Sequence, residues 1–163
     1  MNIPEFWKCN LIFAILLMGI PGIALSGQTK TPLKASLVTQ EKVDFMPNCP
    51  SKFGGTTTGT GKSTHLGKVT LTASDCVTPR EDHFTFDGTF TLIAANGDTL
   101  TGDYSGAFIP TNTGSMYRLS DATFKITGGT GRFIRATGSA ELTGNQDIQT
   151  GEGKIEADGM ISY

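Results

Sequence analysis

The feature that most constrains this chain is the alternation of apolar and polar residues in short runs, which recurs from residue 34 to residue 162. Glycine, proline, asparagine and aspartate separate the runs, and no stretch after residue 27 sustains the period of an amphipathic helix. Alternation places every second side chain on the same face of an extended strand. The pattern therefore predicts an all-β protein.

The clearest pair of strands is predicted within residues 83–108, where two alternating arms flank Asn96-Gly97. A two-residue loop would put the apolar residues of the two arms on opposite faces of the hairpin. A three-residue loop over residues 95–97, with Gly97 in the left-handed conformation, pairs Leu92 with Leu100 and unites them. Burial of one apolar face favours this longer loop. The face then carries Phe84, Phe86, Phe90, Leu92, Leu100, Tyr104 and Phe108.

The other alternating runs are predicted as strands over residues 34–45, 53–61, 66–76, 118–127, 137–144 and 152–162. With the hairpin they make about eight strands, the number that closes a barrel around side chains or one small ligand. Leu37, Val43 and Phe45 are expected on the apolar face of the first strand. Glycines inside strands, such as Gly102 and Gly106, suit the tight coiling of a barrel. An eight-stranded antiparallel closed barrel, calycin-like in type, is favoured over a two-sheet sandwich.

Residues 1–26 are typical of a secretory signal peptide. Lys8 precedes an apolar run over residues 11–25, and this run ends at the small-x-small pattern of residues 24–26. A membrane anchor is the alternative, but the run is short for a bilayer span and is broken by Pro21. We expect a mature single β-barrel domain over residues 27–163, with no membrane span after cleavage, that is secreted or periplasmic.

The charge pattern argues against polyanionic partners. The formal net charge is −2, and loss of Glu5 and Lys8 with the signal would leave it unchanged. Basic residues are scattered rather than clustered, so nucleic acid and anionic membrane surfaces are poor candidates as partners. The sequence does not indicate an oligomeric state.

Cys49 and Cys76 are expected to form a disulfide, because they are the pair that would remain in an oxidising compartment after removal of the signal. They are symmetric about Lys62-Ser63, so a hairpin turning there would bring them together; a turn nearer His65 would weaken this argument. Neither CxxC spacing nor a nearby histidine pair accompanies them, so we expect no metal site. No cofactor is expected.

Two glycine-rich segments have a superficial likeness to phosphate-binding loops. The first, GGTTTGTGKST over residues 54–64, has Thr56 where a P-loop needs its first glycine, and an alternating run follows instead of a helix. We interpret it as a strand entering a hairpin turn. The second, GGTGRF over residues 128–133, lacks the third glycine of a dinucleotide fingerprint and the aspartate of a calcium-binding repeat.

The segment GGTGRFIRATG, residues 128–138, resembles the GGTG-x-F-x-x-A-x-G pattern of the allene oxide cyclase barrel-like group, which includes plant allene oxide cyclases and dirigent proteins. Residues 64–67 and 88–100 are similar to segments of small exported bacterial proteins of that type. The resemblance covers most of the chain after residue 54 and implies an eight-stranded barrel with GGTGRF between two late strands. There Thr130 could cap one helical turn, and Phe133 and Ile134 could close a barrel end. No site residue of those families aligns clearly here.

Few titratable residues attract a catalytic interpretation. His65 and His83 lack the neighbours of a triad or metal site, so surface or edge positions are expected for both. Glu141 should face away from the interior. Tyr104 falls on the apolar face, where its hydroxyl needs a partner. A core tyrosine bonded to the backbone is the simpler interpretation of it.

Three functions remain open. The first is binding of a small apolar molecule in the barrel mouth, because the predicted inner face is apolar and carries few ionisable groups. The second is a cofactor-free isomerase or cyclase of the allene oxide cyclase type, which would act by shape and exclusion of water. The third is a structural or interaction protein with a filled barrel. The candidate ligand-lining residues are Phe84, Phe86, Phe90, Tyr104 and Phe108.

Overall fold

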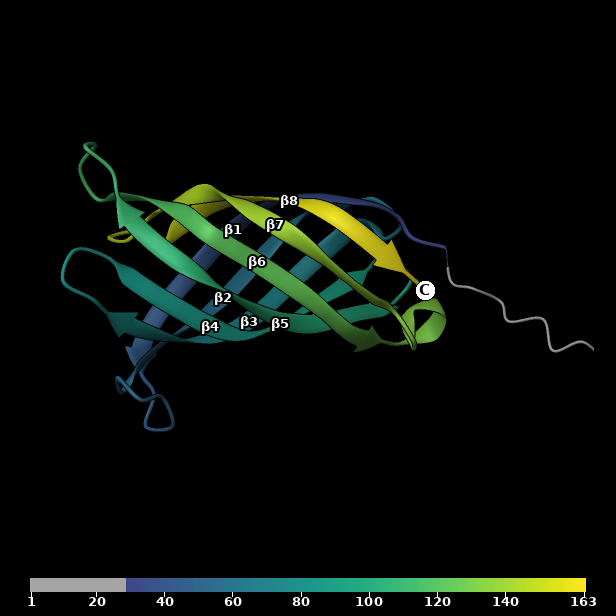
Figure 1. The fold of residues 1–163 in the computed structure, drawn as a ribbon, viewed down its shortest axis with the longest axis horizontal. Helices are drawn as coiled ribbons and strands as arrows, with labels where there is room; N and C mark the ends of the chain where they lie inside the picture. Colours follow the sequence, from purple (N-terminus) through teal and green to yellow (C-terminus); the bar gives the residue numbers. More distant parts are fainter. Residues whose placement is uncertain (1–28) are drawn as a thin grey trace, which may run out of the picture.

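In a computed structural model, which describes residues 29–163, the chain forms one closed barrel of antiparallel strands. Each strand pairs with its neighbour in the sequence, and the last pairs with the first (Figure 1). The predicted signal peptide lies outside the described residues. The elements are β1 (Thr31–Phe45), β2 (Phe53–Ser63), β3 (Gly67–Pro79), β4 (Phe84–Ala94), β5 (Thr99–Pro110), β6 (Met116–Gly129), the 3-10 turn η1 (Gly131–Phe133), β7 (Thr137–Asp147) and β8 (Glu152–Ser162).

The predicted fold class and the predicted β4–β5 hairpin are both confirmed. Leu92 pairs with Leu100, and Gly97 has a φ of 88°, in the left-handed region that glycine adopts without strain. The Ala94 N–H donates to the Asp98 carbonyl at 2.9 Å, which leaves residues 95–97 as the loop. A requirement to bury one apolar face was therefore enough to fix the register of this hairpin.

One end of the barrel, on the right of Figure 1, is sealed by apolar side chains. Phe133 from η1 is fully buried there. The other large side chains that are fully buried are Leu33, Leu100, Ile126 and Ile161. The expectation that Ile134 also closes this end is wrong, since Ile134 is 70% exposed. Successive residues of a helical turn point about 100° apart, so only one of the two can point inward. The Thr130 hydroxyl does not cap the turn and instead accepts the Thr99 N–H at 2.9 Å.

The opposite end is open and carries the loops over residues 46–52, 80–83, 111–115 and 148–151. Val43 and Phe45 share the inward face of β1 with Leu37, as expected, but they are 57% and 64% exposed. The expectation that they add to a buried face is therefore wrong. Both residues lie at the rim, beyond the part of the barrel that side chains fill.

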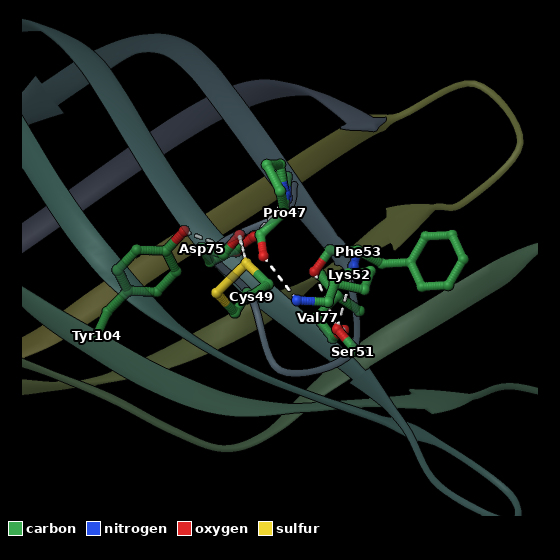
Figure 2. The surroundings of a disulfide bond; sticks show 10 residues. Pro47, Cys49, Ser51, Lys52, Phe53, Asp75, Val77 and Tyr104 are labelled. Atoms are coloured by element: carbon green, nitrogen blue, oxygen red, sulfur yellow. Dashed lines mark hydrogen bonds between the residues drawn. A yellow bond between two sulfur atoms is a disulfide. The ribbon is translucent and has the colours of Figure 1, made fainter. Parts of the chain in front are cut away.

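The Cys49–Cys76 disulfide forms on the outside of the barrel. The hairpin turns at residues 64–66 and pairs Ser63 with Gly67, so the turn predicted at Lys62-Ser63 is displaced. Cys76 consequently faces Gly54 rather than Cys49. Cys49 reaches it because the β1–β2 loop folds back over this pair, and a Cβ at Gly54 would lie 3.2 Å from the Cys49 sulfur. Figure 2 shows the bridge beside Asp75 and Ser51.

Candidate functional site

A small chamber of ≈ 70 Å³ lies inside the barrel, and the open end forms a wider hollow, here called the mouth, of ≈ 670 Å³. Glu41, Phe108 and Gln146 line both spaces, so the chamber opens toward the mouth. The sealed end blocks the other exit. Of the five residues predicted to contact a ligand, Phe86, Phe90, Tyr104 and Phe108 line the chamber and Phe84 lines the mouth.

Aromatic rings form one wall of the chamber. The Phe86 ring lies 4.7 Å from that of Phe108 and 5.7 Å from that of Tyr104, measured between centroids. Gly106 is the β5 partner of Phe86, and a Cβ there would lie 2.8 Å from the Phe86 ring. Gly102 makes room for Phe90 in the same way. These strand glycines therefore leave the space that large inward rings occupy.

Polar side chains form a second part of the lining, here called the polar wall, and Asp75 of β3 is its centre. Its side chain is buried, with a relative exposure of 5%. The Tyr104 hydroxyl donates to Asp75 Oδ2 at 2.7 Å (Figure 2). The Gly55 N–H donates to Asp75 Oδ1 at 2.9 Å. Tyr104 thus finds its partner in a carboxylate, and the simpler interpretation of a tyrosine bonded to the backbone is wrong.

Glu41 of β1 is the second buried carboxyl group, with a relative exposure of 7%. The Gln146 amide donates to Glu41 Oε2. Glu41 Oε1 is buried and has no hydrogen-bond partner among residues 29–163. A Cβ at Gly55 would overlap Glu41 Oε1 and would lie 2.8 Å from Asp75 Oδ1, so both carboxyl groups pack against Gly55 and only glycine leaves room for them.

The pKa values of Glu41, Asp75 and Tyr104 are all raised above their ordinary values. Burial raises the pKa of Glu41, the hydrogen bond from Gln146 opposes this, and the neighbouring Asp75 carboxylate raises the pKa further. Burial also raises the pKa of Asp75, against the hydrogen bonds from Tyr104 and Gly55. The pKa of Tyr104 is raised by burial and by Asp75, which keeps its hydroxyl protonated and donating.

The comparisons with known proteins bear on the fold. No family model and no curated protein sequence matches the chain. A solved structure of a pterocarpan synthase dirigent protein matches with a TM-score of 0.58 and 14% identity, over 93% of this chain and 99% of that one. The chain has a dirigent-like barrel fold. At this identity the likeness shows the fold alone, and no residue role is transferred from it.

The two carboxyl groups of this dirigent-like barrel were missed by the sequence reasoning. The expectation of an apolar inner face with few ionisable groups holds for most of the chamber, but it did not identify Glu41 and Asp75. Alternation already contained the signal: Glu41 has the same parity along β1 as Leu37, and Asp75 continues the inward series of Val69 and Leu71. A charged side chain in a strand usually faces solvent, and this general preference obscured the signal. Gln146, the penultimate residue of β7, lies beyond the end of the predicted strand.

The remaining polar candidates lie away from the chamber. His65 sits in the β2–β3 turn at the sealed end, where Nε2 is 2.9 Å from the Pro32 carbonyl. His83 pairs with Asp82 in an exposed loop. Glu141 is exposed on the outer face of β7, as expected. Within residues 29–163 no cluster of three or more metal-ligating side chains occurs, and no helix is long and apolar enough to span a bilayer.

Proposed function

We propose that this protein is an exported bacterial barrel that binds a small, largely apolar molecule through its open end. The observation that carries the proposal is the chamber itself, with one closed end, aromatic walls and a few convergent polar groups at one side. Binding sites for small molecules have this composition. The signal-like residues 1–26, the Cys49–Cys76 disulfide and the resemblance to exported bacterial barrels support export.

The dimensions limit the ligand. Sites for drug-sized molecules enclose about 300–1,000 Å³, whereas the chamber encloses ≈ 70 Å³. It therefore accommodates one compact group, and the rest of a larger ligand lies in the mouth against Phe84, Phe108 and Val77. The chamber also argues against a barrel filled entirely by its own side chains.

A matched pair of substitutions tests this proposal. Ala73 lines the chamber, and its neighbour Thr72 is exposed on the outer face of β3. We expect benzyl alcohol, followed by NMR titration of backbone amides, to bind saturably and to shift amides of the chamber strands. Ala73→Leu fills the space and should weaken this binding by at least about tenfold, while Thr72→Leu leaves it unchanged. Absence of saturable binding, or equal binding by the two variants, would contradict the proposal.

A second candidate is a cofactor-free isomerase or cyclase, and Glu41 is the observation that favours it. Its raised pKa and burial suit a carboxylic acid that lends a proton to a substrate oxygen and recovers it in the rearranged product. No co-reactant is consumed in such a step. The solved neighbour is itself named a synthase. Turnover of a candidate substrate that Glu41→Gln abolishes, with binding retained, would decide for this candidate over simple binding.

A further inference from the structure

The chamber contains an imbalance of charge. Glu41 and Asp75 are both more than nine-tenths buried and border the same point beside Gly55. No lysine, arginine or histidine is among the described residues that line the chamber. Buried carboxylates in folded proteins are normally paired with a cation or hydrogen-bonded at each oxygen, because isolated burial is costly.

Hydrogen bonds within the described part of the chain leave one carboxyl oxygen of the polar wall without a donor. Both oxygens of Asp75 have donors, and Glu41 Oε2 has Gln146. Glu41 Oε1 has none, although it is fully buried and its side chain lines the chamber. A buried acceptor without a donor is rare in native proteins and calls for a partner that the chain does not supply. The missing partner is a donor in the chamber that Glu41 lines.

The aromatic rings of the chamber indicate which chemical group the donor is. Rings of Phe86, Phe90, Tyr104 and Phe124 line the same chamber as the carboxyl groups. The faces of such rings carry partial negative charge and attract cations, most strongly where water is excluded. A neutral hydroxyl could bond Glu41 Oε1 but would leave two carboxyl groups facing each other. A protonated amine supplies the hydrogen bond, balances the negative charge and suits the rings.

We propose that the chamber recognises the ammonium group of an organic amine, whose apolar body lies against the aromatic rings and extends toward the mouth. The inference rests on the binding function proposed above and specifies its ligand class. Glu41 Oε1 accepts an N–H of the ammonium group, and Asp75 contributes the second negative charge. Gly55 is required at its position because any side chain there would displace the Glu41 and Asp75 carboxyl oxygens that pack against it.

The test compares two probes of nearly equal shape that differ in charge, benzylammonium and benzyl alcohol, by calorimetric or NMR titration near neutral pH. The wild-type protein should bind benzylammonium about tenfold more tightly than benzyl alcohol, or better, as expected for a hydrogen bond between charged groups in a dry site. Glu41→Gln keeps the shape of the side chain and should remove this preference. A cooperative urea unfolding transition shows that the variant is folded.

Glu141→Gln provides the matched control, because it removes the same charge from the outer face of β7. It should leave both affinities unchanged, which excludes general attraction of cations to an acidic protein. Tighter or equal binding of benzyl alcohol by the wild type overturns the amine inference and leaves the binding function intact. Loss of benzylammonium binding in Glu141→Gln as well as in Glu41→Gln also overturns it. If neither probe binds, the proposed binding function and the inference are overturned together.

Discussion

The two ends of this barrel differ in what their side chains do. At the sealed end, Phe133, Leu100 and Ile161 are completely buried against one another. At the open end, the apolar residues Val43, Phe45 and Phe53 are more than half exposed, and two carboxyl groups are buried below them. Both ends belong to the same eight strands. The difference therefore arises from which side chains point inward along each strand, and from the single turn η1 that covers one end.

This contrast separates stability from function within one sheet. Burial of large apolar side chains is the main stabilising contribution, and it is concentrated at the sealed end. Buried carboxyl groups with an unpartnered oxygen oppose folding, and they are concentrated next to the mouth. Sites of binding and catalysis often carry such a cost. The prediction is that substitutions at the sealed end change stability most, whereas substitutions at the polar wall change pH dependence and binding.

The largest effect is expected from Phe133→Ala. Removal of a completely buried phenylalanine leaves a cavity that the surrounding β-barrel cannot fill, which costs about 3–5 kcal/mol. Denaturant unfolding of the oxidised protein measures this loss. Ile134→Ala, one residue further and 70% exposed, should change stability by no more than about 0.5 kcal/mol. Similar losses in the two variants would show that η1 does not seal the barrel through Phe133.

The sealed end was largely predictable from the sequence because its residues follow simple alternation. Leu92 and Leu100 face each other as the hairpin argument required, and Phe133 is buried as the GGTGRF segment suggested. The error at Ile134 came from treating two adjacent apolar residues alike in a turn whose direction the sequence does not show. Where burial alone decides orientation, pattern reasoning succeeds.

The open end was predicted less well, for two physical reasons. Val43 and Phe45 have the correct parity, but parity does not reveal where along β1 the packed interior stops. Glu41 and Asp75 have inward parity as well, yet a lone charged residue in a strand usually faces solvent. Their burial depends on donors from β2, β5 and β7, namely Gly55, Tyr104 and Gln146. Such a network across strands cannot be recognised from one strand at a time.

The second largest effect is expected from loss of the disulfide, which fastens the β1–β2 loop at the open end. The linked cysteines are 27 residues apart, and closure of a loop of this size stabilises a protein by about 3 kcal/mol. The double variant Cys49→Ala/Cys76→Ala should be less stable by this amount in denaturant unfolding. Reductant should destabilise the wild type similarly and leave the double variant unaffected. If the reduced and oxidised wild-type proteins unfold at the same denaturant concentration, the disulfide contributes nothing to the free energy of unfolding.

The smallest effect is expected from Glu41→Gln, which removes a charge but no packing, and it appears as a change in pH dependence. Burial raises the folded-state pKa of Glu41 above its ordinary value of 4.5, so the folded protein retains a proton that the unfolded chain has released. Stability is therefore greatest below the ordinary pKa and falls as the pH rises through the raised one. Asp75 contributes with the same sign, so Glu41→Gln should flatten this fall without abolishing it. Urea midpoints between about pH 4 and about pH 8 measure the slope. Glu141→Gln is the control and should keep the wild-type slope, because Glu141 is exposed on the outer face. Equal slopes for all three proteins would mean that Glu41 titrates as it does in the unfolded chain. The polar wall would then not exclude water from Glu41.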